Sequence, residues 1–285
     1  MPEGDTIHRI ANRLRPLVGQ TIDRALTQGL ERNLASLRIA RIEATGKHLE
    51  IELVDDIEHK RDTTIRAHLG MYGAQRSYAR EAGELMLKRI SPGKVTLALF
   101  TEKTVQLWIG ARTIEISARR APRHGMAIRT LGHDVLAPDF DPRAAGERAA
   151  KEPDRTLAAV LLDQRIAAGI GNVYKCEIAF AVSLDPRTLV RDISVDRLEE
   201  CYAVAREQMV PNLGPGPRTT RQAQAGDRPN DTRYFVYGRG GKPCRTCGAA
   251  IIVYKLGEPP RWTWSCPWCQ KAPVRAAGAA TGDDS

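Results

Sequence analysis

Two pairs of cysteines near the C-terminal end constrain the fold of this chain more strongly than any other feature. Cys244 and Cys247 form one C-x2-C pair, Cys266 and Cys269 form a second, and the 18 residues between them include the strand-like runs IIVYKL and RWTWS. Two such pairs on a β-hairpin place four thiolates around one Zn²⁺; the alternative is four free thiols spaced this way by chance. Four thiolates leave no open coordination position, so we expect one structural zinc ion that stiffens a small hairpin.

The hydrophobic pattern changes along the chain. Between about residues 21 and 120, short alternating runs such as HLEIELV, VTLALF, TVQLWI and TIEIS predict a β-sandwich or barrel. A short helix is expected before these runs, because Gly4-Asp5-Thr6 can cap a helix and apolar residues then recur at helical spacing, at Ile7, Ile10, Leu14 and Leu17. Beyond about residue 155 the apolar spacing becomes helical. The fold class is therefore α+β with several domains.

Composition places the domain boundaries. We expect a β-rich N-terminal domain over residues 1–135 and a linker at 136–150, where the chain is charged and contains prolines. A helical domain should follow at 151–233, and its Gly- and Pro-rich part, 213–232, is predicted to be a mobile loop because it has little apolar surface to bury. The cysteine hairpin occupies 234–273, and 274–285 are expected to form a disordered tail.

The net charge is compatible with a polyanionic partner. Lys and Arg number 43 against 34 Asp and Glu, which gives a formal charge of +9. Basic surfaces favour nucleic acid through phosphate neutralisation, although many unrelated proteins are equally basic. The chain has no apolar run of about 18 residues that could span a bilayer and no signal-peptide core, so we expect a protein of the bacterial cytosol with no membrane partner.

The N-terminus offers a nucleophile. Methionine followed by the small residue Pro2 favours removal of Met1, which leaves a secondary amine at the start of the chain. An α-amino group has a pKa of about 7.7 to 8, against about 10.4 for lysine, so part of it is unprotonated at neutral pH. Such an amine can attack an aldehyde-level carbon and form an iminium, with Glu3 beside it as general acid or base. Because many proteins begin with Met-Pro, the assignment of Pro2 and Glu3 to a catalytic site needs support from other parts of the sequence.

Motifs spread over nearly the whole chain supply that support. The start PEGDT, the strand ATGKHLEIEL, the element RAHLGMYGAQR, the segment LLDQRIAAGIGNVYKCEI and the final FVYGRGGKPC with R-x4-CPWCQ occur in this order. In these motifs the chain resembles the formamidopyrimidine-DNA glycosylase and endonuclease VIII family. The resemblance implies an N-terminal β-sandwich with flanking helices, a helix-two-turn-helix domain and a C-terminal zinc finger. It also implies a monomeric, bifunctional glycosylase and abasic-site lyase acting on duplex DNA with oxidised bases or abasic sites.

The resemblance assigns roles in the N-terminal domain. Pro2 would attack the sugar carbon through a Schiff base, followed by β,δ-elimination, and Glu3 would assist base loss and proton transfer. Lys47 would contact the phosphate or a sugar oxygen near the lesion; its alternative is an exposed lysine at a strand end. His68 and Met71 belong to the element that approaches the lesion.

Met71, with or without Tyr72, would fill the gap left by the everted base, since an apolar wedge compensates lost stacking. Periodicity alone would make Met71 a core residue instead.

Further residues are implied in the C-terminal half. Asn172 stands in a Gly-Asn turn before a helix, where amides can hold a phosphate; a simple helix cap is the alternative. Arg261 matches the finger's phosphate-binding arginine. Tyr237, which is followed by Arg239 at the start of the hairpin segment, is a further expected DNA-binding residue.

The lesion preference is less determined than the reaction. An arginine-phenylalanine pair typical of the formamidopyrimidine enzymes is missing from TEKTVQLWIGARTIEIS. This absence leaves the contact to the orphaned base unassigned. PEGDT and Tyr72 favour the endonuclease VIII side and oxidised pyrimidines, whereas the loop at 213–232 favours oxidised guanine. The sequence is also compatible with a catalytically silent damaged-DNA-binding module or with an unrelated zinc-ribbon protein.

Overall fold

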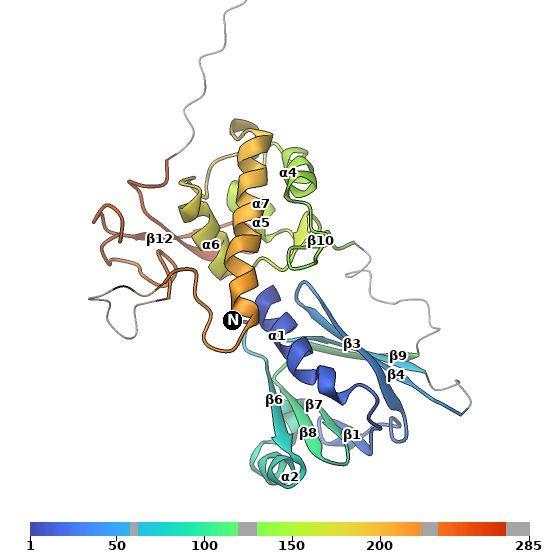
Figure 1. Cartoon of the computed structure of the whole chain (residues 1–285). Coiled ribbons are helices and arrows are strands. Elements are labelled where there is room, and N and C mark those ends of the chain that lie inside the picture. The colour runs from blue at the N-terminus through green and yellow to red at the C-terminus, as the bar shows by residue number, and fades with distance from the viewer. Residues whose placement is uncertain (58–61, 119–129, 223, 225–232, 272–285) are drawn as a thin grey trace, which may run out of the picture. The chain divides into compact units, whose positions relative to one another are not determined.

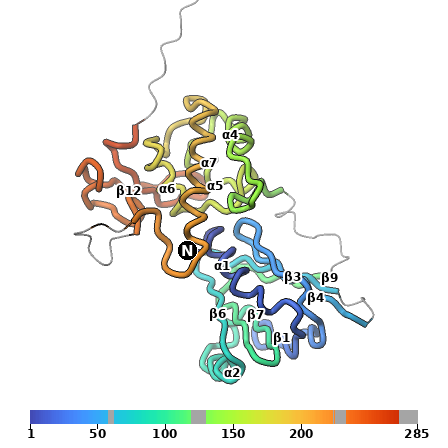
Figure 2. Tube along the Cα trace, viewed as in Figure 1, coloured from blue at the N-terminus to red at the C-terminus, as the bar shows by residue number. Residues whose placement is uncertain are grey.

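The chain forms two compact units. The computed structural model describes residues 1–57, 62–118, 130–222, 224 and 233–271. The first unit comprises residues 1–130 with 213–215, and the second comprises 131–212 and the chain from 216 onward. Figures 1 and 2 trace both units along the chain.

The first unit is a β-sandwich, as predicted. One sheet has five strands in the order β2-β1-β7-β8-β6, and the other has four in the order β3-β4-β5-β9. All neighbouring strands are antiparallel. The strands are β1 (Arg24–Thr27), β2 (Leu30–Glu31), β3 (Arg38–Thr45), β4 (His48–Val54), β5 (Thr63–His68), β6 (Ala74–Ala79), β7 (Val95–Phe100), β8 (Thr104–Ile109) and β9 (Thr113–Ala118).

The expected N-terminal helix is α1 (Gly4–Leu14), which the short 3-10 helix η1 (Arg15–Leu17) continues. Its apolar stripe joins the main core, where Ile7, Ile10 and Leu14 are at most 5% exposed beside buried side chains of β3 and β4. Their helical spacing puts these side chains on one face of the helix, and that face is buried in the core of the sandwich. Burial of the stripe therefore fixes the start of the chain to the sandwich.

A second helix, α2 (Arg80–Arg89), packs on β8 and β6 (Figure 1). It approaches so closely at Gly83 that a Cβ there would lie 2.4 Å from the Cβ of Val105. Only glycine fits this contact. The 3-10 helix η2 (Pro92–Lys94) then leads into β7.

The second unit is mostly helical. Its elements are β10 (His133–Asp134), α4 (Pro142–Ala150), α5 (Leu157–Leu162), β11 (Ala167–Ala168), α6 (Asn172–Ala181), η3 (Val190–Asp192), α7 (Val195–Met209), η4 (Val210–Leu213), β12 (Ile252–Leu256) and β13 (Arg261–Ser265). Helix α6 lies at its centre, in contact with α5, α7 and β13, and its residues from Asn172 to Phe180 are all buried. Among the described residues, no helix is both long and apolar enough to cross a bilayer.

The segment at 136–150 differs from the linker expected there. It contains α4, whose start is capped by the Asp141 carboxylate, which accepts from the backbone N–H groups of Arg143 and Ala144. Gly146 lies directly on α7, where an added Cβ would be 2.8 Å from the backbone nitrogen of Glu199. The charged and Pro-containing composition resembles a linker, but here the proline starts a helix and small residues let that helix pack closely.

The predicted loop at 213–232 has an ordered first part. The amide of Asn212 accepts from the backbone N–H of Thr219 at 2.9 Å and donates to its carbonyl at 2.7 Å. The backbone N–H of Thr220 donates to the carbonyl of Arg233 at 2.9 Å, which joins the ordered first part of the loop to the residue that follows it. Residues 223 and 225–232, like the expected tail at 274–285, lie outside the described residues.

Candidate active site and nucleic-acid interface

The first residues of the chain are held at the start of α1. Glu3 is the N-cap residue, and its carbonyl accepts from the backbone N–H groups of Thr6 at 2.9 Å and Ile7 at 3.2 Å. The Glu3 side chain is fully buried, and Pro2 is half-buried. A carboxylate at a helix start is favoured by the backbone dipoles. The chain thus presents Pro2 from a fixed support and not from a loose tail.

Lys47 lies at the tip of a hairpin between β3 and β4. Thr45 pairs with His48, so Gly46 and Lys47 are the two central residues of a tight turn. Gly46 has φ +56°, which glycine adopts without strain. Lys47 itself is half-buried and lies in the turn, so it differs from the exposed strand-end lysine of the alternative interpretation.

His68 ends β5 directly opposite His48 on β4. Their rings are 4.9 Å apart and tilted by 43°. Burial, together with the neighbouring charges of His48, Lys47 and Arg112, lowers the pKa of His68 from its usual value near 6.5 to about 4. The pKa of His48 is also lowered, first by burial and then by Lys47 and Arg66. Both rings are therefore neutral at neutral pH in the free protein.

This pair makes stability depend on pH. Because the pKa of His68 is about 4 when folded and about 6.5 when unfolded, the unfolded state binds more protons between these values. The free energy of unfolding should therefore fall as the pH drops from about 6.5 to about 4. We expect the urea midpoint of the wild type to fall more across this window than that of His68→Gln. An NMR titration that gives His68 a pKa near 6.5 would contradict this expectation.

Met71 and Tyr72 lie in the turn between β5 and β6, and their side chains are 43% and 90% exposed. The interpretation of Met71 as a core residue is therefore wrong. The backbone N–H of Gly73 donates to the carbonyl of Leu69 at 3.2 Å, which closes the turn. Gly70 has φ +69°, and a Cβ there would lie 2.8 Å from the Cβ of Arg112. The turn holds two exposed apolar side chains on a fixed backbone.

In the second unit, the N-cap of α6 is Gly171, and Asn172 is the first helical residue. The Asn172 side chain does not act as a simple cap. Its Nδ2 donates to the carbonyl of Trp262 at 2.9 Å, and its Oδ1 accepts from the Nζ of Lys175 at 2.8 Å. The Asn172 amide therefore joins α6 to the cysteine hairpin.

The four cysteines come together as the sequence predicted. Their sulfur atoms all lie within 4.8 Å of one another, with Cys244 and Cys269 at 3.8 Å and Cys247 and Cys266 at 3.4 Å. Tetrahedral zinc with Zn–S bonds of about 2.3 Å requires sulfur atoms about 3.8 Å apart. Backbone N–H groups of Thr246 and Cys269 also point at two of these sulfurs. This donor set fits a closed, four-sulfur metal site.

The remaining predicted residues lie around this hairpin. Arg261 is the first residue of β13, half-buried and paired with Leu256. The Tyr237 ring is 4.6 Å from that of Trp264 and belongs to a partly buried apolar cluster. Arg239 is 5% exposed and donates to the carbonyls of Phe235 and Pro243. Arg239 thus supports the fold of the hairpin segment.

Two buried charges on α6 escaped the sequence analysis. Lys175 and Glu177 are both fully buried, and each makes several hydrogen bonds to the cysteine hairpin or the segment before it. The available signal was a lysine and a glutamate on an otherwise apolar helix, NVYKCEIAFA. Ionised side chains in such a position need specific partners.

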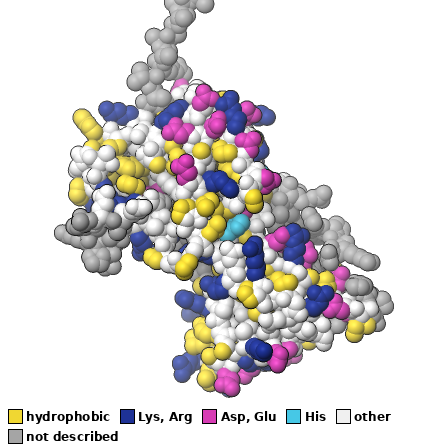
Figure 3. Space-filling view, in the orientation of Figure 1, with side chains coloured by type: hydrophobic (Ala, Val, Ile, Leu, Met, Phe, Trp, Pro, Cys, Tyr) yellow, Lys and Arg dark blue, Asp and Glu magenta, His cyan; other side chains and the backbone are white. Residues whose placement is uncertain are grey.

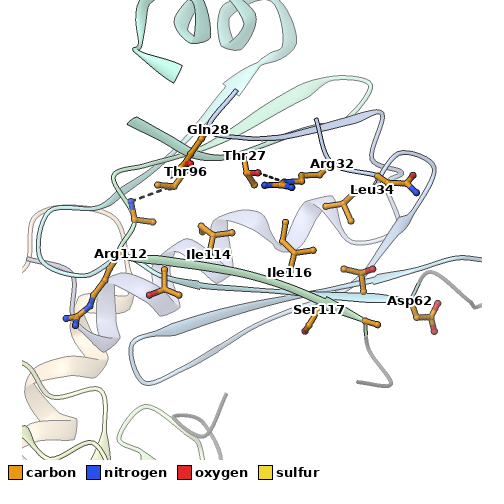
Figure 4. Close-up of a pocket in the computed structure, with 15 residues that line it drawn as sticks. Thr27, Gln28, Arg32, Leu34, Asp62, Thr96, Arg112, Ile114, Ile116 and Ser117 are labelled. Atoms are coloured by element: carbon orange, nitrogen blue, oxygen red, sulfur yellow. Dashed lines mark hydrogen bonds between the residues drawn. The ribbon is translucent and has the colours of Figure 1, made fainter. Parts of the chain in front are cut away.

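A cavity of about 760 Å³ opens between the two sheets of the sandwich. In Figure 4, Arg32 reaches toward Thr27 inside it, and Ile114 and Ile116 of β9 form one wall. None of the site residues predicted from the sequence lines this cavity. On the face drawn in Figure 3, Lys and Arg side chains are interspersed with Asp and Glu on both units. Neither feature on its own marks a small-molecule site.

Known proteins share this arrangement. The model of the formamidopyrimidine-DNA glycosylase H2TH domain matches residues 131–222. The DNA-(apurinic or apyrimidinic site) lyase Nei2 of Mycolicibacterium smegmatis is 34% identical over 95% of this chain and 100% of its own length. Probable endonuclease 8 2 of Streptomyces coelicolor is 32% identical over 99% of this chain and 98% of its own.

Solved structures agree in fold. Lactococcus lactis formamidopyrimidine-DNA glycosylase, bound to DNA with an abasic site, superposes with a TM-score of 0.73 at 21% identity, covering 95% of this chain and 100% of that one. MutM of Thermus thermophilus gives 0.70 at 25% identity, covering 94% and 98%. The sandwich, the helix-two-turn-helix unit and the cysteine hairpin are thus those of a DNA repair glycosylase fold. By its identity to the curated relatives over nearly its whole length, the chain belongs to the formamidopyrimidine-DNA glycosylase and endonuclease VIII family.

Proposed function

We propose that the protein is a bifunctional DNA glycosylase and abasic-site lyase of base excision repair. The observation that carries this proposal is the N-terminus, where Pro2 stands on a helix whose N-cap residue, Glu3, has a fully buried side chain. Family membership suggests that these two residues act on DNA, because the curated relatives are named as a DNA-(apurinic or apyrimidinic site) lyase and a probable endonuclease 8.

The chemistry begins at the sugar of the damaged nucleotide. After removal of Met1, the Pro2 nitrogen attacks C1′, the bond from C1′ to the base breaks, and the base leaves with a proton. Opening of the sugar ring breaks the bond between C1′ and its ring oxygen, which takes up a proton, and leaves an iminium between Pro2 and C1′. Glu3 is the group that we assign to these proton transfers.

The iminium is an electron sink that makes both eliminations possible. Loss of a C2′ proton expels the 3′ phosphate, and loss of a C4′ proton then expels the 5′ phosphate. Water hydrolyses the remaining iminium and frees the Pro2 amine. The strand is cut with phosphate at both ends, and no cofactor is consumed.

The other predicted residues hold the DNA. We assign phosphate contacts to Lys47, His68, Asn172 and Arg261, and the gap left by the everted base to Met71 and Tyr72. Tyr237 packs within the hairpin segment and is assigned a supporting position. We assign one structural Zn²⁺ to Cys244, Cys247, Cys266 and Cys269, whose four sulfurs fit it.

Oxidised pyrimidines are the substrates that we propose. The endonuclease 8 names of the relatives and the exposed Tyr72 support this preference over oxidised guanine. Matched duplexes carrying thymine glycol, dihydrouracil, 8-oxoguanine or an abasic site separate the possibilities in one strand-cleavage experiment. We expect cleavage at the abasic site and at both pyrimidines, at least about tenfold faster than at 8-oxoguanine, a difference of about 1.4 kcal/mol in activation free energy. Faster cleavage at 8-oxoguanine would reverse the preference, and tight binding without any cleavage would favour a damage-binding module.

A further inference from the structure

Lys175 is a buried cation with a defined set of acceptors. It is 0% exposed, and its Nζ donates to Asn172 Oδ1 at 2.8 Å, to Thr263 Oγ1 at 2.8 Å and to the carbonyl of Trp262 at 3.4 Å. An ammonium group removed from water is costly unless its three hydrogens are bonded. Here three acceptors surround it, so the position is specific for a compact cation.

These acceptors lie on two elements that are far apart in the sequence. Asn172 begins α6, whereas Trp262 and Thr263 follow Arg261 on β13. The carbonyl of Trp262 accepts from both Lys175 and Asn172, which closes a three-residue ring of hydrogen bonds. This ring also fixes the Asn172 amide, because exchanging its oxygen and nitrogen would direct an NH2 group at the ammonium.

Glu177 makes a separate attachment from the same helix. Its carboxylate accepts from three consecutive backbone N–H groups, those of Phe235, Val236 and Tyr237, and from the hydroxyl of Thr220. That attachment holds the segment before the hairpin and the base of the 213–232 loop. Lys175 therefore belongs to a separate connection, in which it and Asn172 join α6 to strand β13.

We propose that Lys175 is a positioning residue that couples the Asn172 turn to Arg261, so that the two bind DNA phosphates as one rigid unit. This inference rests on the proposed function, which assigns phosphate contacts to both residues. An ammonium group is a costly way to fill a buried position, because it must be taken out of water and held by specific partners. The cation serves here to orient the Asn172 amide and the first residues of β13.

A double-mutant cycle tests the coupling. The dissociation constant for a duplex with an uncleavable abasic analogue is measured for Asn172→Ala, Arg261→Ala and the double variant, with Lys175 and with Lys175→Met. With Lys175 present, the fold-loss of affinity in the double variant should be at least about fivefold smaller than the product of the two single fold-losses. With Lys175→Met, the losses should multiply, and affinity should already be about tenfold weaker than in the wild type.

Matched variants separate positioning from stability. Lys151→Met removes an exposed lysine from the same unit and should change affinity by less than about twofold. Lys175→Arg keeps the charge and should recover part of the affinity. If Lys175→Met does not fold, Thr263→Val, which deletes one acceptor and keeps the lysine, is expected to weaken binding and reduce the coupling.

Hydrogen exchange of the free protein separates this inference from the proposed function. We expect faster exchange of the β13 amides in Lys175→Met than in Lys151→Met, at equal zinc content. Wild-type protein that fails to bind damaged DNA would overturn the proposed function, while the exchange rates would still decide whether Lys175 orders β13. Unchanged exchange, or unchanged coupling in a wild type that binds, would overturn the inference.

Discussion

Keeping the Pro2 nitrogen in a peptide bond is expected to abolish strand cleavage at abasic sites. An N-terminal extension that is not removed turns the secondary amine into an amide, which has no free lone pair with which to attack C1′. We expect the rate of cleavage to fall on the order of 1,000-fold or more, as losses of nucleophiles in other enzymes suggest. The measurement is single-turnover cleavage of a duplex with one abasic site.

The control is the same protein after the extension is cut off to expose Pro2. Cleavage activity should return, and DNA binding should be similar before and after. Because Glu3 and the start of α1 are buried, melting of both forms must be compared to confirm that the extension leaves the fold intact. A blocked form that cleaves as fast as the exposed form would contradict the assignment of the nucleophile.

Removing the metal site is expected to have the second-largest effect. A structural zinc site supplies about 10–16 kcal/mol to isolated zinc-finger peptides, more than a short hairpin can supply alone. Cys247 is exposed, so Cys247→Ser leaves no cavity in the core. We expect this variant to lose its zinc, to lose exchange protection in β12 and β13, and to bind damaged DNA on the order of 100-fold more weakly, because the strand that carries Arg261 is no longer held.

A second cysteine provides the matched control. Cys201 on α7 is buried and lies outside the four-sulfur cluster, so Cys201→Ala should keep the zinc and most of the DNA affinity. The sandwich should keep its exchange protection in both variants, because its core is built from residues of the first unit alone. Zinc and affinity that both survive Cys247→Ser would contradict a structural role for the four thiolates.

The features that depend on local pattern were predictable from the sequence. The apolar spacing of Ile7, Ile10 and Leu14 predicted α1, and alternating runs predicted the strands of the sandwich. Fixed spacing of four cysteines predicted the four-sulfur cluster. Each of these features follows from a local repeat or a local motif. Predicting it therefore required no knowledge of long-range contacts.

The features that depend on pairing were not predictable in this way. The contact of His48 with His68 requires the register of two strands, which the pattern of either strand does not contain. Two partners of Lys175, Trp262 and Thr263, lie 87 and 88 residues away, on a hairpin whose place beside α6 is set by packing. Helix α4 was missed because its charges resemble a linker, although its small residues pack on α7.

The central claim is that a covalent bond joins the N-terminal nitrogen to the DNA sugar. Borohydride reduces the iminium to a stable amine, so the protein can be trapped on a duplex with an abasic site. The trapped protein can then be digested and its peptides identified by mass spectrometry. We predict that the sugar remnant is found on the nitrogen of Pro2, in a peptide that lacks Met1. A remnant on Lys47 or on any other lysine, or a reaction that cuts the strand without a trapped complex, would contradict the account.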